Sequence, residues 1–178
     1  MQFHGVCMSA DGKRVLLIVA SMDFRDEEYL ETRKVLESAG AIITTASSRA
    51  GESTGTMGSK ITVDKGLSEV GSGSFDAVVF IGGPGAKEFF DDTRAHKLAL
   101  EAVNQGKVVA AICIAPSILA NAGVLNGKKA TAFISEKDNM ESHGAKYTGN
   151  DVTKDGKIIT ASGPHAAGDF GRLIANKL

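Results

Sequence analysis

The sequence has only two cysteines, Cys7 and Cys113, and they lie far apart along the chain. So few cysteines argue against the disulfide framework of a small secreted domain. The N-terminal stretch MQFHGVCMSADGKR lacks the apolar segment of a secretory signal, and no apolar run approaches the ~20 residues that span a bilayer. We therefore expect a cytoplasmic protein with free thiols and no contact with a membrane.

An excess of charge of one sign is also missing. Twenty basic and 21 acidic residues give a formal net charge of -1, and the basic residues form no stripe. This balance argues against a nucleic-acid partner and against a polybasic membrane-binding segment. The chain also lacks repeats, low-complexity segments and linkers. We expect a single domain over residues 1–178, in which residues 1–13 are an N-terminal extension.

Apolar runs of strand length alternate with segments patterned like helices. RVLLIVAS, residues 14–21, is almost continuously apolar, which indicates a strand covered on both faces. In the helix expected next, acids crowd the first turn and Gly40 supplies the stop. We expect the buried face of this helix to carry Tyr29, Leu30, Val35 and Leu36.

The same alternation continues to the end of the chain. Further strands are expected at 41–47, 75–81 and 107–112, with a small hairpin within 48–60. Short strands are expected within 128–162, with a turn at Asp155-Gly156. Helices are expected at 93–106, 115–122 and 164–178, and the first of them should be buried through Leu98, Leu100 and Val103. Alternating strands and helices predict an α/β fold with a mostly parallel sheet and helices on both faces. Ligands bind such folds beyond the carboxyl ends of the strands. Three segments converge there: residues 22–28, the GGPGA turn at 82–86, and Cys113.

The stretch VVAAICIAPSILANAG, residues 108–123, predicts a strand that turns into a helix at Cys113. Such a sharp turn requires small neighbours, and Ala111 and Ala115 meet this demand. The helix N-terminus favours a thiolate at the apex, and the N–H of Ile114 is a ready donor for an oxyanion. A free cysteine is more often a small buried apolar residue, but the small-x-Cys-x-small pattern favours a reactive thiol.

Five segments together resemble the ThiJ/PfpI superfamily, which includes deglycases and an intracellular peptidase. They are VLLIVASMDFRDEEYLETRKVLESAGA, FDAVVFIGGPGAKEF, AAICIAPSILANAGVLNGKKAT and EKDNMESHGAKY, followed by DGKIITASGPHAAGDFGRLI at the end of the chain. The resemblance covers nearly the whole sequence. It implies a flavodoxin-like three-layer sandwich and a homodimer or larger homo-oligomer.

The resemblance also implies a site. It places the nucleophile at Cys113, its protonated acidic partner at Glu28, and the oxyanion donors at the N–H groups of Gly83 and Ile114. A carboxyl group beside a buried thiolate should have a raised pKa, because both groups cannot easily hold negative charge. The residues alone also allow Glu28 to be a solvated first-turn acid, as expected for Asp26 and Glu27, and Gly82-Gly83 to be simply a turn.

The sequence departs from the family at both usual positions of a general base. Peptidases of the family carry a histidine directly after the cysteine, where this chain has Ile114. The deglycases carry one in the following strand, where this chain has Phe133. His165 follows a Gly-Pro that opens the last helix beside the pocket, so it is a candidate replacement, although a solvent-facing helix-start residue is an equal alternative.

No cofactor and no metal site are expected. GGPGA lacks the spacing of a dinucleotide-binding loop, and His4 with Cys7 supplies only two potential ligands. His96 is expected to be exposed on a helix and His143 to lie in a surface loop.

Three functions follow from this pattern. The first is an enzyme that uses Cys113 on small carbonyl compounds, with glyoxalase-like or deglycase-like chemistry. The second is a redox or stress-response protein in which Cys113 is oxidised to the sulfinic acid and Glu28 stabilises it. The third is an intracellular peptidase, which Ile114 disfavours.

Overall fold

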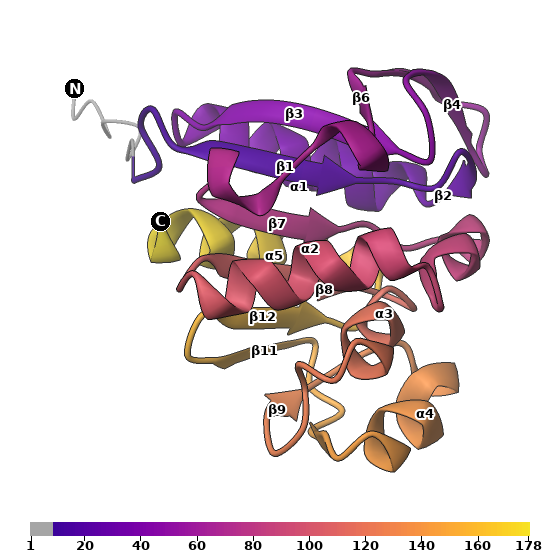
Figure 1. Ribbon diagram of the computed structural model, residues 1–178, viewed down its shortest axis with the longest axis vertical. Coiled ribbons are helices and arrows are strands. Elements are labelled where there is room, and N and C mark those ends of the chain that lie inside the picture. Colours follow the sequence, from indigo (N-terminus) through magenta and orange to yellow (C-terminus); the bar gives the residue numbers. More distant parts are fainter. Residues whose placement is uncertain (1–8) are drawn as a thin grey trace, which may run out of the picture.

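The computed structural model describes residues 9–178, and these form a layered α/β fold (Figure 1). Their central seven-stranded sheet has the order β11-β12-β8-β7-β1-β3-β6, and every neighbouring pair except β11–β12 is parallel. The five main parallel strands therefore follow the chain order 2-1-3-4-5, which is the flavodoxin-like order. The expected mostly parallel sheet is confirmed.

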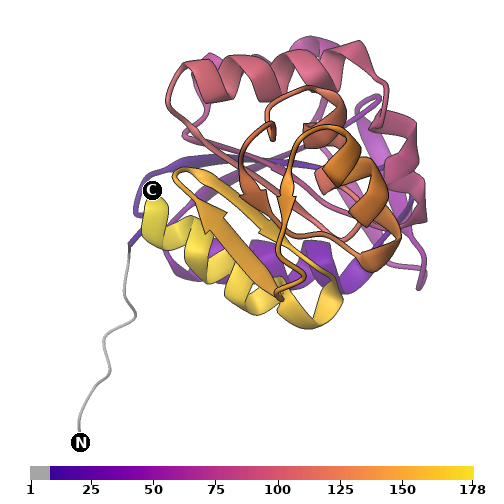
Figure 2. The same cartoon turned by 90° about the horizontal axis from the view of Figure 1, so that it is seen from below.

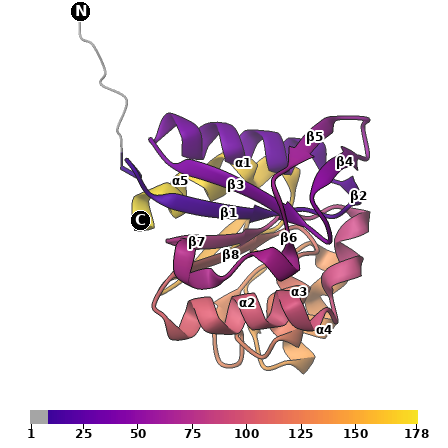
Figure 3. The same ribbon diagram turned by 45° about the horizontal axis from the view of Figure 1, so that its top comes forward.

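Helices cover both faces of this sheet. The helices α1 and α5 pack against each other on one face, and α2 and α3 pack on the other (Figure 3). The view towards the β11–β12 edge shows α2 on one side of the sheet and α5 on the opposite side (Figure 2). No helix within residues 9–178 has both the length and the apolarity needed to cross a membrane.

The elements of the sheet and its helices have well-defined bounds. The sheet strands are β1 Arg14–Ile18, β3 Ile42–Ser47, β6 Lys65–Gly66, β7 Ala77–Phe80, β8 Val108–Ile112, β11 Val152–Asp155 and β12 Ile158–Ala161. The helices are α1 Asp26–Ser38, α2 Thr93–Asn104, α3 Pro116–Asn121, α4 Lys137–Ser142 and α5 Ala167–Lys177. Smaller sheets join β2 Met22–Phe24 to β4 Gly51–Gly55 and β5 Lys60–Val63, and β9 Lys129–Ala130 to β10 Lys146–Tyr147.

The continuous apolar run in β1 is explained by its two covered faces. Leu16 and Ile18 belong to the core cluster under α2 and α3, whereas Val15 and Leu17 belong to the cluster under α1 and α5. Successive side chains of a strand point to opposite faces, so a strand covered on both sides needs apolar residues at every position. This packing holds the carboxyl ends of β1, β7 and β8 side by side.

Two helices bury different residues from those expected. On α1, Tyr29 and Leu36 are buried, but Leu30 is exposed and Val35 is only half-buried. On α2, Leu98 is buried and Val103 is half-buried against the core, as expected, but Leu100 is exposed. The other buried residues of α2 are Ala95, Ala99 and Ala102, so small side chains make part of its contact with the sheet.

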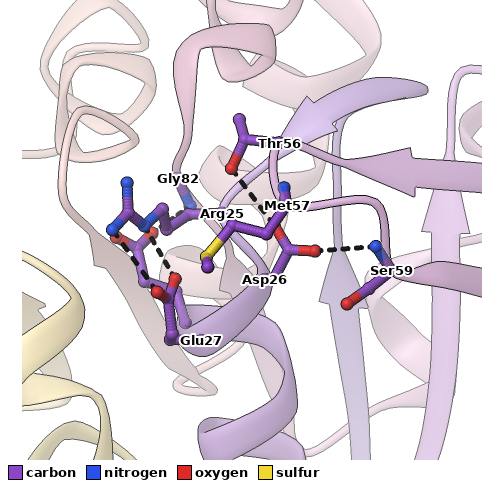
Figure 4. A network of polar contacts seen from close by, with 8 residues as sticks. Arg25, Asp26, Glu27, Thr56, Met57, Ser59 and Gly82 are labelled. Carbon is purple, nitrogen blue, oxygen red and sulfur yellow. Dashed lines mark hydrogen bonds and ion pairs between the residues drawn. The ribbon is translucent and has the colours of Figure 1, made fainter.

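Asp26 and Glu27 differ from the solvated pair that was expected. Glu27 is half-exposed and pairs with Arg25, but Asp26 is buried under the β4–β5 hairpin (Figure 4). The Asp26 carboxylate accepts hydrogen bonds from the N–H groups of Met57 (2.9 Å) and Ser59 (3.0 Å). Burial alone would raise the pKa of Asp26, but these bonds outweigh burial and lower it to about 2. Asp26 therefore fastens the hairpin to the start of α1.

We expect Asp26→Asn to lower the free energy of unfolding by about 1–3 kcal/mol at pH 7, because an amide cannot accept hydrogen bonds on both of its atoms. The control is Glu27→Gln, which removes a charge from the neighbouring half-exposed position. A depressed carboxyl pKa stabilises the fold above the ordinary value near 4, and this gain disappears as the pH falls towards 2. In urea titrations, the free energies of unfolding of the wild type and of Asp26→Asn should therefore converge over that pH range. Equal losses in both variants at pH 7 would contradict the anchoring role.

Candidate active site

The expected turn at Cys113 is present and has an unusual backbone. Strand β8 ends at Ile112, α3 begins at Pro116, and Cys113 between them has a φ of +64°. A left-handed conformation is uncommon for a residue with a side chain and is retained only where the surroundings fix it. Here the N–H of Cys113 donates to the carbonyl of Ala161 (2.9 Å), and its own carbonyl accepts from the N–H of Phe133 (2.8 Å).

The glycine turn after β7 passes directly against this cysteine. A Cβ atom on Gly82 would lie 2.6 Å from the Cβ of Cys113 and 2.6 Å from Oε1 of Glu28, so only glycine fits. Gly83 has a φ of +105°, and a side chain there would collide with the backbone of Arg25. The Gly82-Gly83 pair thus forms a turn, and it also packs directly against Cys113 and against the start of α1.

Glu28 is fully buried on the first turn of α1, next to the thiol. Its Oε1 atom accepts a hydrogen bond from the N–H of Gly82 (3.0 Å), and its Oε2 atom has no hydrogen-bond partner within residues 9–178. Burial raises the pKa of Glu28 to about 8, against the opposing effects of Cys113, Gly82 and Arg25. The structure therefore places Glu28 as a buried acid rather than as a solvated first-turn residue.

The thiol of Cys113 is half-buried, and its pKa moves opposite to the expected direction. Burial, followed by the charge of the Glu28 carboxylate, raises the pKa of Cys113 to about 12. The N–H groups of Gly83 and Ile114 lower it, but α3 has only six residues and offers a weak helix dipole. Protonation of Glu28 removes this repulsion, so the two groups titrate as a coupled pair.

A cavity of about 450 Å³ opens over Cys113 at the carboxyl end of the sheet. Its lining residues are Arg25, Gly83, Pro84, Lys87, Cys113, Ile114, Phe133, Ser135, Glu136 and Pro164. The wall thus combines apolar side chains with two cations and one carboxylate. This volume and composition are typical of a site for a small molecule.

The model of the DJ-1/PfpI family matches residues 13–177. The chain belongs to the DJ-1/PfpI family. An uncharacterized protein of Methanocaldococcus jannaschii is 41% identical over 161 residues, which cover 89% of this chain and 78% of that protein. Deglycase PfpI of Pyrococcus furiosus is 32% identical over 149 residues, 84% of this chain and 90% of that enzyme.

A solved structure of the same family shows the same fold. The ThiJ/PfpI domain protein from Brachyspira murdochii superposes with a TM-score of 0.91 at 32% identity, covering 94% of this chain and 96% of that chain. The layered architecture built around the Cys113 turn is therefore that of the DJ-1/PfpI family.

The histidine considered as a replacement base lies outside the DJ-1/PfpI-type cavity. The side chain of His165 is 62% exposed, and its Nε2 atom lies 3.0 Å from Oδ1 of Asp151. Its neighbour Pro164 lines the cavity, but His165 does not. The Gly-Pro turn directs the next side chain away from the thiol, which proximity in sequence could not reveal.

The other histidines also lie away from the cavity. His96 is half-buried rather than exposed, because its Nε2 atom is 2.7 Å from the carbonyl oxygen of Phe90. His143 is exposed at the end of α4. His4 and Cys7 lie outside the described residues. Within residues 9–178, no three His, Cys, Asp or Glu side chains are placed together to hold a metal ion.

Sequence reasoning missed three charged residues of the cavity wall. Arg25 precedes α1, Lys87 follows the glycine turn, and Glu136 is the residue directly before α4. The helix that follows Glu136 has only six residues and was not expected, so no pattern marked the residue before it. Arg25 lies within residues 22–28 and Lys87 directly follows residues 82–86, the two loops that were expected to converge. Their position in these loops could have indicated that they line the site.

The buried acid predicts a pH dependence of stability. A carboxyl whose pKa is raised from 4.5 to about 8 stabilises the fold fully below pH 4.5, and this contribution is lost as the pH rises through 8. The free energy of unfolding should fall across this window with a slope of up to about 1.4 kcal/mol per pH unit. In Glu28→Gln this slope should disappear, because the neutral amide does not titrate.

Urea unfolding of the wild type, Glu28→Gln and the control Glu27→Gln across this pH range measures the effect. The histidines titrate in all three proteins and therefore cancel. A wild-type slope that persists in Glu28→Gln would show that another group is responsible.

Proposed function

We propose that the protein is a cysteine-dependent enzyme that acts on small reactive carbonyl compounds or their adducts, in a glyoxalase-like or deglycase-like reaction. The observation that carries the proposal is the half-buried Cys113 thiol, held in a strained turn against an acid of raised pKa and open to a small-molecule cavity. Similarity to deglycase PfpI of Pyrococcus furiosus supports the same class.

The proposed reaction with an α-oxoaldehyde starts at sulfur. The ionised form of Glu28 accepts the thiol proton while the sulfur forms a bond to the aldehyde carbon, and the carbonyl electron pair moves to oxygen. The N–H groups of Gly83 and Ile114, which already interact with the sulfur, are the proposed donors to this oxyanion. Return of the proton from Glu28 to oxygen then gives a neutral hemithioacetal.

The remaining steps need no external oxidant. A proton moves from the former aldehyde carbon to the adjacent ketone carbon, and the hydroxyl proton of the hemithioacetal moves to the ketone oxygen. Together these transfers convert the hemithioacetal into the thioester of a 2-hydroxy acid. Water then adds to the thioester, the carbon–sulfur bond breaks, and the sulfur regains a proton. The products are the 2-hydroxy acid and the free thiol.

Oxidation of Cys113 is the second candidate function. The sulfur is accessible from the cavity and lies among three potential hydrogen-bond donors: Glu28, Gly83 and Ile114. Two equivalents of peroxide would convert it through the sulfenic to the sulfinic acid, which a protonated Glu28 would stabilise. A peptidase remains the least favoured function, because Ile114 stands where the peptidases have histidine.

Variants at the paired groups test the enzyme proposal. Cys113→Ala should abolish conversion of methylglyoxal to lactate, and Glu28→Leu should lose about 10²–10⁴ in rate. His165→Ala should lose less than about tenfold, or about 1.4 kcal/mol of barrier, because its side chain faces Asp151 rather than the cavity.

Circular dichroism should first confirm that each variant folds. An inactive His165→Ala beside an active Glu28→Leu would reverse the assignment. An inactive wild type whose Cys113 is oxidised at low peroxide would favour the redox function.

We also propose that the protein forms a homodimer. The exposed Leu30 lies with Ile43 and Ile61 in a shallow groove along α1 and β5, and a second copy would cover it. Light scattering at micromolar concentration should give about twice the monomer mass of 18.5 kDa. Leu30→Glu should shift the mass towards the monomer, while the control Leu100→Glu, at an exposed position on α2, should not. A wild-type mass near 18.5 kDa would contradict the dimer.

A further inference from the structure

The proposed reaction requires a base that faces the substrate, and Glu28 does not. Glu28 is fully buried behind Gly82 and does not line the cavity. It can exchange a proton with the sulfur and with an oxygen close to it, but the carbon-to-carbon proton transfer takes place on the cavity side. Among the lining residues, the side chains that can exchange a proton besides Cys113 are Arg25, Lys87 and Glu136. Arginine and lysine are protonated at neutral pH, so neither serves as a ready base.

We propose that Glu136 is this base: it takes the proton from the former aldehyde carbon of the hemithioacetal and returns it to the adjacent ketone carbon. The carbon–hydrogen electron pair forms the enediolate, and the hydroxyl proton of the former aldehyde carbon then passes to the former ketone oxygen. Protonation of the second carbon completes the thioester. The transfer is an isomerisation, so it needs no co-reactant. This inference rests on the proposed function and assigns its second proton-transfer step.

Glu136 is held in place by hydroxyl groups on both of its carboxylate oxygens. The Oγ of Ser117 donates to Oε1 (2.8 Å) and the Oγ of Ser135 donates to Oε2 (2.6 Å). Ser117 is fully buried in α3 and accepts in turn from Nδ2 of Asn139 (3.0 Å). Each carboxylate oxygen keeps a free lone pair, so the group is oriented and can still accept a proton.

The same segment is tied to the nucleophile. The N–H of Phe133 donates to the carbonyl of Cys113 (2.8 Å), and the N–H of Glu136 donates to the carbonyl of Phe133 (2.9 Å). Ser117, which holds the Glu136 carboxylate, stands in the first turn of the helix that follows Cys113. The base and the sulfur are therefore positioned by one continuous set of contacts, as a short proton transfer requires.

The charges around Glu136 suit this role. Arg25 and Lys87 line the same cavity, and Lys137 and Asp138 follow Glu136 on α4. Lys137 pairs with Glu141, Arg25 pairs with Glu27, and Glu136 is in no ion pair within residues 9–178. An unpaired carboxylate is available as a base, and the nearby cations can stabilise the negative charge of the enediolate.

Glu136→Gln tests the inference in methylglyoxal turnover. We expect kcat to fall by about 10²–10⁴. Glu136→Asp should retain part of the activity, because the carboxylate remains. The matched control is Glu141→Gln, which removes one exposed negative charge from the helix that follows Glu136 and should stay at the wild-type level. Alkylation of Cys113 by iodoacetamide should be unchanged in all of these variants, since Glu136 acts on the substrate and not on the thiol.

The pH profile separates a base from a structural residue. The acid limb of kcat/KM reports the groups that the free enzyme needs deprotonated. In the wild type, Glu28 sets the limb near pH 8. Glu136→Gln should lower kcat/KM across the whole limb and leave its midpoint unchanged, whereas a structural role that displaced the Cys113–Glu28 pair would shift the midpoint.

Three results would overturn the inference. If Glu136→Gln matches Glu141→Gln in turnover, the base is another group, although the enzyme proposal stands. If alkylation of Cys113 falls together with turnover, Glu136 supports the turn rather than the reaction. If the wild type does not convert methylglyoxal at all, the proposed function and this inference fail together.

Discussion

The site depends on one steric contact, the passage of Gly82 against Cys113 and Glu28. A Cβ at Gly82 would also lie 2.7 Å from the carbonyl oxygen of Ile112, so three elements meet where no side chain fits. The strained backbone of Cys113 moves its sulfur out of β8 towards this point, and α1 brings the Glu28 carboxyl to the same place. The glycine turn is thus part of the geometry of the candidate site and not only a loop connection.

Two acids on the first turn of α1 show how hydrogen-bond donors from other segments determine the pKa of a carboxyl group. Asp26 accepts several hydrogen bonds from the β4–β5 hairpin and keeps a pKa of about 2. Glu28, two residues later, accepts one backbone bond and has a pKa of about 8 because of burial. The same residue class therefore fixes structure at one position and holds a proton at the other, and the difference comes from their partners in other segments.

This dependence on distant partners explains what could be predicted from the sequence. The parallel sheet followed from apolar runs such as that of β1, and the Cys113 turn followed from its small neighbours, because both patterns are local. The burial of Asp26 depends on a hairpin about thirty residues away, and the orientation of His165 depends on Asp151. Leu30 and Leu100 were expected on the buried faces of their helices but are exposed. Helical periodicity does not determine which residues face the sheet when alanines and threonines can also occupy the buried positions.

Glu28 is buried against Gly82 and Glu136 lies in the cavity wall, and this separation suggests how, in the proposed reaction, one thiol can serve several proton transfers. Glu28 is fully buried and does not line the cavity, so its proton is placed to pass to the sulfur and not to the reacting carbons. Glu136 faces the cavity and is held through Ser117 to the helix that Cys113 precedes. The proton transfer between the substrate carbons needs a base in direct contact with the substrate. The proton transfer at sulfur needs a partner that does not repel the thiolate. Two separate residues can meet these two needs, whereas a single histidine beside the sulfur would have to meet both. The absence of histidine at positions 114 and 133 is therefore consistent with an active enzyme that divides the work between two acids.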